Sequence, residues 1–465
     1  MFLFEREINV PAKDTDDLLS YCEQAVLRSL APGEMPIRFV VTQNDGRTLR
    51  CELGVLAGAE GAPAVGPASV FEFARRMAPI FAFAQRAVEN TEAFNAVLLV
   101  PTGIGAQIGG HCGDAGPVAR LLASACHTLI THPNVVNAAD INELPENGLY
   151  VEGSVISRLL MGRIGLQKVR SNRVLLVIDE HKDRGVSELA VNAASAARAT
   201  LGIECPVVIR MDPPIYTLSR YAPSGRAAGR IEGLERLCEV LSRHRPAFDA
   251  VALSTVIQLP EHWYRDYLPS YGEVINPWGG VEAMLTHAVS LIFDVPSAHA
   301  PMVESVELLN MHVGVVDPRK AADAISTTFL YSVLKGLHRS PRIIRAPAAF
   351  GQPGVLTAAD VSCLVIPDGC VGLPTLAAFR QGIPVIAVRE NRNLMKNDLE
   401  ALPHMPGKLF IVENYLEAVG VMAALRAGVS PAAVRRPLAQ TTVVREQAGS
   451  DERVGGASHP AGRLG

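Results

Sequence analysis

The 465-residue sequence has little of what marks several large classes of protein. Charged residues make up only 19% and the formal net charge is −4, so no basic surface for nucleic acid or an anionic membrane is expected. The eight cysteines are scattered and form no Cys-x-x-Cys pair, which argues against a disulfide framework and against a zinc site. No apolar run approaches the roughly 18 residues that a membrane helix needs.

The first ten residues also lack the apolar core of a secretory signal, because Glu5, Arg6 and Glu7 fall within them. We therefore expect a cytoplasmic protein with reduced thiols. Its expected partner is a small-molecule substrate, with no nucleic acid, no membrane, no metal and no cofactor. A homo-oligomer is compatible with the sequence.

The length exceeds one ordinary hydrophobic core and predicts two or three domains. Residues 1–92 are interpreted as a small α+β region, with a helix after Asp17 and strands near residues 37–43 and 49–58. The polar, glycine-rich residues 438–465 are predicted to be a disordered tail.

Short apolar runs recur from residue 95 onward, as in NAVLLVP, RVLLVIDE and DAVALSTV. They are nearly continuous in Val, Ile and Leu, which is typical of parallel strands covered on both faces, and helix-like segments separate many of them. We predict an α/β fold of two doubly wound parallel-sheet lobes, residues 93–305 and 306–437, with a cleft between them.

The strongest candidate loop is TGIGAQIGGHCGDAGP, residues 102–117, because ligands of parallel sheets gather beyond the carboxyl ends of strands. Its glycines permit close backbone approach, and the following helix N-terminus attracts anions. We expect it to cradle a negative group, although a turn that merely packs is an open alternative. The binding candidates are Gly103, Gly105, Gly109, Gly110 and Cys112, and the catalytic candidates are His111 and Asp114.

Polar side chains also follow other predicted strands. His132, Asn134, Asn137 and Glu152 are candidates to orient substrate hydroxyl or carboxylate groups, although caps and turns would use the same residue types.

The stretch NPWGGVE contains one of only two tryptophans in the chain. Asn276, Trp278 and Glu282 are candidate substrate contacts, and the alternative is a tryptophan that fills a seam between lobes. His299 lies near the expected lobe boundary, where it is either a general acid or base or a structural histidine.

The segment PDGCVGLPTLAAFRQGIPVIAVRENRN, residues 367–393, is predicted to form a βαβ unit with polar residues after both strands. Asp368 and Cys370 are the catalytic candidates there. The binding candidates are Gly369, Gly372, Glu390, Asn391 and Asn393.

Two resemblances arise from these motifs. Residues 95–437, with TGIGAQIGGHCGDAGPVARLL, THPNVVNAADI and NPWGGVEAMLTHA, resemble an uncharacterised bacterial family, a domain of unknown function. PDGCVGLPTLAAFRQGIPVIAV is similar to the nucleotide-binding segment of GT-B glycosyltransferases and UDP-GlcNAc 2-epimerases, which implies a two-lobed fold. The acidic residue that binds ribose in those enzymes would fall at Ala377, so this sequence departs from their pattern there.

Cys112 and Cys370 allow a second chemistry, since cofactor-independent racemases of the Asp/Glu type place two thiols across a cleft. Our leading hypothesis is a soluble enzyme of transferase or epimerase type, acting on a small, polar, anionic, sugar-like or phosphorylated metabolite. The first alternative is a cofactor-independent isomerase, lyase or hydrolase that uses Cys112 and Cys370. The second is a non-catalytic ligand-binding protein.

Overall fold

The structure is a computed structural model. It describes residues 1–445 except 14, 59–71, 73–75, 112, 261–262, 264–265, 271–273 and 311–312, so residues 446–465, most of the predicted tail, lie outside the described part. The described tail residues 438–445 are irregular and exposed.

The N-terminal region forms an antiparallel layer with one helix. The elements are β1 (Phe2–Pro11), α1 (Leu18–Ser29), β2 (Met35–Asn44) and β3 (Thr48–Ala57), which confirms the expected helix and strands. Asp17 begins α1, because its carboxylate accepts the Ser20 N–H at 3.1 Å. Later segments complete this layer, in the order β12 (Tyr216–Tyr221), β13 (Ala227–Glu232), β1, β3, β2 and β19 (Val371–Gly372).

A first parallel sheet is built from two distant parts of the chain. Its order is β21 (Leu409–Val412), β20 (Val385–Val388), β18 (Val361–Pro367), β4 (Asn95–Leu98), β5 (Thr128–Thr131) and β8 (Gly148–Tyr150). All neighbouring strands are parallel. Its helices are α3 (Gly116–Ala123), α5 (Gly153–Leu160), α13 (Leu373–Gln381) and α14 (Tyr415–Arg426).

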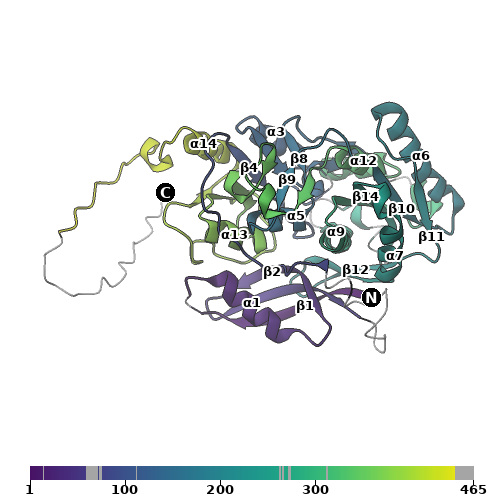
Figure 1. Cartoon of the computed structure of the whole chain (residues 1–465), viewed down its shortest axis with the longest axis horizontal. Helices are drawn as coiled ribbons and strands as arrows, with labels where there is room; N and C mark the ends of the chain where they lie inside the picture. The colour runs from purple at the N-terminus through teal and green to yellow at the C-terminus, as the bar shows by residue number, and fades with distance from the viewer. Residues whose placement is uncertain are drawn as a thin grey trace.

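A second parallel sheet has the order β11 (Val208–Met211), β10 (Val174–Asp179), β14 (Ala250–Gln258) and β15 (Ser297–Met302). The associated helices are α6 (Arg184–Leu201), α7 (Leu234–His244), α9 (Gly279–Phe293) and α12 (Leu330–His338). Because β12 also pairs with β14, this sheet continues into the N-terminal layer. Figure 1 shows β4 and β8 on one side, β14, β10 and β11 on the other, α9 between them, and the purple N-terminal layer along one flank.

The remaining described elements are short: α4 (Pro133–Val136), β6 (Asn137–Ala138), β7 (Ile141–Asn142), β9 (Gly165–Gln167), η1 (Arg245–Ala247), α10 (Val306–Leu309), η2 (Pro318–Lys320), α11 (Ala321–Ile325), β16 (Arg342–Ile344), η3 (Pro347–Ala349), β17 (Val355–Leu356), η4 (Ala358–Asp360) and η5 (Pro431–Val434).

The α/β class with two parallel sheets is confirmed, but neither sheet is a continuous stretch of chain. The chain leaves the first sheet after β8, builds the second, and returns to the first at β18, which pairs with β4. The expected boundary near residue 305 therefore does not separate the sheets, because strands from residues 95–150 belong with those from 361–412. Strand order runs outward in both directions from the β18–β4 pair, so a topological switch point lies there, where α/β folds bind ligands.

Candidate functional site

A cavity of about 300 Å³ lies beyond the carboxyl ends of the strands at this switch point. Segments that follow β4, β5, β8 and β18 of the first sheet line it, and β15 of the second sheet and helix α9 close another side. Strand β2 of the N-terminal layer contributes residues 37–40. All three layers of the molecule therefore share one cavity.

Glu152 and His287 form a buried acid–imidazole pair in the cavity wall. Glu152 follows β8 and begins α5, where its carboxylate accepts the Ser154 N–H at 2.9 Å and also the Ser154 hydroxyl. Its other oxygen is paired with Nδ1 of His287, from α9. Burial raises the pKa of Glu152, but His287 and the Ser154 hydrogen bonds more than offset that effect, so the pKa lies below its ordinary value. Glu152 is thus an ionised carboxylate that orients an imidazole.

The second ring nitrogen of His287 is available to a ligand. Within the described residues, the partner of His287 is Glu152 through Nδ1, while Nε2 makes no hydrogen bond, and the residue lines the cavity. Gly153 leaves room for the ring, because a Cβ at that position would lie 3.1 Å from His287 Cε1. This geometry suits a general base or acid.

His132 is a neutral hydrogen-bond donor at the same edge of the sheet. It follows β5, and its Nε2 accepts the Val100 N–H at 3.1 Å, so the remaining ring proton sits on Nδ1. Burial lowers the pKa of His132 to about 4. His132 lines the cavity and stays uncharged near neutral pH.

A second acid–imidazole pair comes from the other sheet. His299 of β15 has Nδ1 2.9 Å from the Glu282 carboxylate of α9, and its Nε2 lies 2.9 Å from the Thr255 hydroxyl. Nε2 also accepts the Thr255 N–H at 3.2 Å, which places the ring proton on Nδ1. Both nitrogens are occupied, so His299 is held more firmly than His287.

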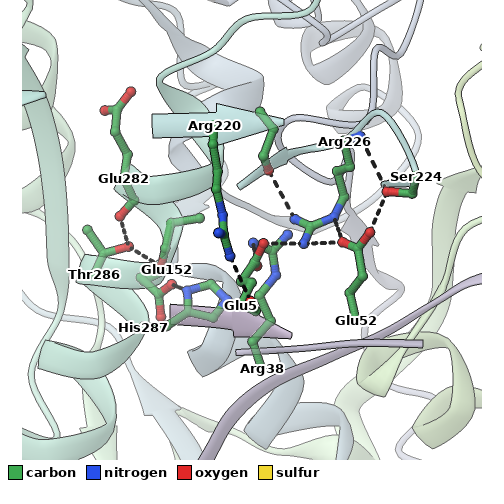
Figure 2. Close-up of polar contacts among 12 residues, drawn as sticks. Glu5, Arg38, Glu52, Glu152, Arg220, Ser224, Arg226, Glu282, Thr286 and His287 are labelled. Atoms are coloured by element: carbon green, nitrogen blue, oxygen red, sulfur yellow. Dashed lines mark hydrogen bonds and ion pairs between the residues drawn. The ribbon is translucent and has the colours of Figure 1, made fainter. Parts of the chain in front are cut away.

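A network of buried charges links the N-terminal layer to the cavity (Figure 2). Arg226, which directly precedes β13, is fully buried and bonds Glu5 and Glu52, each at 2.6 Å. Arg38 of β2 reaches the other oxygen of Glu5 at 3.3 Å. Two cations and two carboxylates therefore meet where the layer contacts the cavity.

The structure brings ten of the predicted site residues to the cavity wall. They are His132, Asn134, Asn137, Glu152, Asn276, Trp278, Glu282, His299, Cys370 and Gly372. The other described candidates lie outside the lining: Gly103, Gly105, Gly109, Gly110, His111, Asp114, Asp368, Gly369, Glu390, Asn391 and Asn393. Cys112 lies outside the described residues.

The glycine-rich loop packs instead of cradling an external anion. Its own Asp114 carboxylate accepts the N–H groups of Gly109 and His111 at 2.9 and 3.3 Å, so those donors are already bonded. A Cβ at Gly110 would lie 1.9 Å from the Ala106 carbonyl oxygen. The expectation of an anion cradle is corrected here, because the glycines serve close backbone packing.

The second predicted segment, residues 367–393, is hydrogen-bonded to the glycine-rich loop. The Asn391 amide accepts the Ile108 N–H at 2.9 Å and donates to the Ile108 carbonyl at 2.8 Å. Asp368 accepts the Gly369 N–H, and Asn393 donates to the Asp368 carbonyl at 2.9 Å, whereas Glu390 is exposed. These polar groups are bonded within the protein or exposed, and of this segment's candidates Cys370 and Gly372 reach the cavity wall.

The three catalytic candidates outside the lining all have shifted pKa values, and burial raises the pKa of Asp368 above its ordinary value. Burial lowers the pKa of His111 to about 4, and its Nδ1 lies 3.0 Å from the Tyr267 hydroxyl. Burial raises the pKa of Asp114 to about 7. The side chains of His111 and Asp114 are hydrogen-bonded within the protein, so both residues have a structural role.

Cys370 lines the cavity, but its thiol is poorly suited to ionisation. Burial raises its pKa above the ordinary value, and Asp368 adds to the effect. The expected partner across the cleft, Cys112, lies outside the described residues.

Three candidate amides make hydrogen bonds within the protein. Asn134 donates to the Val100 and Gly109 carbonyls at 3.2 and 2.7 Å, and Asn137 donates to the Tyr150 hydroxyl at 2.7 Å. The Asn276 carbonyl oxygen accepts the N–H groups of Trp278 and Gly279, before α9 begins. Asn134 therefore bonds the backbone, as the turn alternative expected, whereas Asn137 bonds a tyrosine side chain.

Sequence reasoning missed His287 and Arg38. His287 lies inside a nearly uniformly buried helix, and Arg38 lies between two buried residues of strand β2. Neither stands after a predicted strand, where we expected site residues. Within the described residues, no cluster of three or more His, Cys, Asp or Glu is arranged to hold a metal ion, and no helix is long and apolar enough to cross a membrane.

The fold and the cavity define an α/β protein whose two parallel sheets share a buried, polar site. The chain belongs to a family of proteins of unknown function, DUF3326, whose model matches residues 95–435. It is 34% identical over 345 residues to a Synechococcus protein described as an uncharacterized lipoprotein, an alignment that covers 74% of this chain and 93% of the relative. No solved structure matches.

Proposed function

We propose that this protein is an enzyme that moves protons on a small, polar, anionic metabolite held in the cavity, of epimerase or transferase type. The observation that supports this most directly is the Glu152–His287 pair. A buried carboxylate holds Nδ1 of the imidazole, and Nε2 is left unbonded at the cavity wall.

In this proposal His287 Nε2 accepts a proton from a C–H next to a carbonyl, and the electron pair of that bond stays on the substrate as an enolate. Glu152 stabilises the imidazolium that forms, as carboxylates do in His-based catalysis. His132 Nδ1–H donates to the developing oxyanion. Water then supplies a proton to the other face of the enolate and leaves as hydroxide, which the proton held on His287 neutralises, and this completes an epimerisation. A transferase would use the same base to deprotonate an acceptor hydroxyl.

The thiol alternative has weaker support. Cys370 lies in the lining, yet burial disfavours its thiolate, which is the reactive form. We therefore assign the proton transfer to His287. Inactivation of turnover by a thiol alkylating reagent, with protection by the ligand, would instead favour Cys370.

The test begins with a thermal-shift screen of sugar phosphates, nucleotide sugars and dicarboxylates, because a ligand of the native state raises the apparent melting temperature. Each hit is then incubated with the protein in D2O and followed by NMR. Epimerisation exchanges a carbon-bound hydrogen for deuterium, whereas transfer to a hydroxyl does not.

His287→Asn removes the base and is expected to lower turnover by at least about 100-fold. The matched control is His244→Asn, at the end of α7 and outside the cavity lining, which should keep full activity. Turnover that persists in His287→Asn would refute this assignment. Ligand binding with no turnover under any condition would instead support the non-catalytic binding protein.

We also propose a reducing, cytoplasmic location. The seven cysteines in the described part of the chain are all buried free thiols. The Synechococcus relative is described as a lipoprotein, so cell fractionation is the relevant test. Recovery in the soluble cytoplasmic fraction is expected, and a membrane-bound pool would contradict the proposal.

A further inference from the structure

The N-terminal layer contributes a charged side chain to the cavity. Arg38 lies on β2 and lines the cavity together with its neighbours Ile37, Phe39 and Val40. The register between β2 and β3 shifts between Pro36 and Arg38, an irregularity of the kind that redirects side chains. Residues 1–94 lie outside the family match at 95–435, so this cation comes from a part of the chain that the family model does not cover.

Arg38 differs from its neighbour Arg226 in how its donors are used. Arg226 is fully buried, and its three guanidinium nitrogens bond Glu52, the Ala227 carbonyl and Glu5. Arg38 makes one hydrogen bond within the described residues, to Glu5 at 3.3 Å. The Arg38 side chain is 12% exposed, and its other N–H groups are not enclosed by protein. The fork of a guanidinium therefore has free donors at the cavity wall.

Arg38 lies in a cluster of charges of both signs. Glu5 is shared with Arg226, which holds it more closely, and burial together with Arg226 lowers the pKa of Arg38 to about 10. Glu152 is near enough for its negative charge to raise the pKa of Arg38, which opposes the effect of burial. Figure 2 shows Arg38 beside the Glu152–His287 pair. A bound anion would relieve the repulsion between the two arginines and lie next to the proposed base.

We propose that Arg38 binds an oxyanion group of the substrate, a carboxylate or a phosphate, and thereby places the adjacent carbon or hydroxyl at His287. The placement of the reacting atom at His287 rests on the proposed function, whereas the binding of an anion by Arg38 does not. Guanidinium groups bind both planar and tetrahedral oxyanions through paired N–H donors.

The test is isothermal titration of the full chain with inorganic phosphate and, separately, with malonate, at constant ionic strength. We expect at least one of the two anions to bind, and the better one identifies the substrate group. Arg38→Gln should raise the Kd of that anion by about 10- to 100-fold, the loss expected for a charge-assisted hydrogen bond. The matched control, Arg6→Gln, removes an arginine of the same layer that is paired with Glu34 outside the cavity lining, and it should leave the Kd unchanged.

If Arg38→Gln fails to fold, Arg38→Lys serves as the second variant, because lysine keeps the positive charge beside Glu5. It is expected to weaken binding less than the glutamine variant, because the charge persists and the paired donors are lost. Binding of neither anion to the wild type, or equal binding by wild type and the Arg38 variants, would overturn the inference. His287→Asn separates the two proposals: anion binding that survives in this variant supports the Arg38 site whatever the variant does to turnover.

Discussion

Replacing Arg226 with methionine tests whether the buried charge network holds the N-terminal layer on the molecule. The guanidinium is fully buried and bonds Glu5 and Glu52 at 2.6 Å each, so its removal leaves two buried carboxylates without their principal cation. Breaking a buried pair from one side costs about 3–5 kcal/mol of stability. We expect Arg226→Met to lose at least that much free energy of unfolding, measured by urea denaturation with circular dichroism.

The matched control lies on the strand that follows Arg226. Arg230 of β13 pairs with Glu232 at 2.8 Å, but its side chain is 48% exposed, so Arg230→Met should cost less than about 1 kcal/mol. Adding Glu52→Gln to Arg226→Met removes one of the orphaned charges and should recover part of the loss. A cost below about 1 kcal/mol for Arg226→Met, or no recovery in the double variant, would refute the reasoning.

The remaining predictions concern the pH dependence of stability and the packing of two glycines. Burial depresses the pKa of His132 from 6.5 to about 4, so the unfolded chain binds more protons between these values and His132 makes the fold less stable as pH falls from about 6.5 to 4. His132→Gln lacks this contribution, so its free energy of unfolding relative to wild type should rise as pH falls from about 6.5 to 4, measured by urea titration. A difference between the two proteins that does not change with pH would contradict this prediction. Gly336→Ala places a Cβ 2.5 Å from the Tyr150 ring and should destabilise by about 1–3 kcal/mol. Gly420→Ala, in α14 with nothing within 4 Å, should stabilise by about 0.5–1 kcal/mol, and the two melting temperatures should shift in opposite directions.

The topology explains why the site draws on distant parts of the chain. The first sheet takes its central strands β4 and β18 from parts of the matched family region that lie far apart in the chain, and their carboxyl ends open onto the same cavity. Helix α9 supplies both Glu282 and His287. His287 pairs with Glu152, which follows β8 of the first sheet, and Glu282 pairs with His299 of the second. The helix therefore couples the two sheets across the cavity.

The sequence by itself determined the α/β class and several residues at the cavity wall. Strands such as β10 are apolar up to their last residue because both faces are covered, and this pattern is visible without coordinates. His132 and Glu152 were found because polar residues after the ends of such strands meet at one edge of a sheet. His299 was chosen for its place near the expected lobe boundary, and the structure puts it inside strand β15 instead of a loop. These inferences depend only on local composition and on the geometry of parallel sheets.

Tertiary structure alone decided which side chains face each other. The glycine-rich loop has the composition of an anion cradle, yet Asp114 and Asn391 occupy its polar groups, a fact that depends on contacts across the fold. The sequence around His287 and Arg38 does not mark them as site residues, because the role of each depends on a partner that is distant in the sequence and close in the fold. Composition constrains what a segment can form, whereas long-range pairing decides which donors remain free for a ligand.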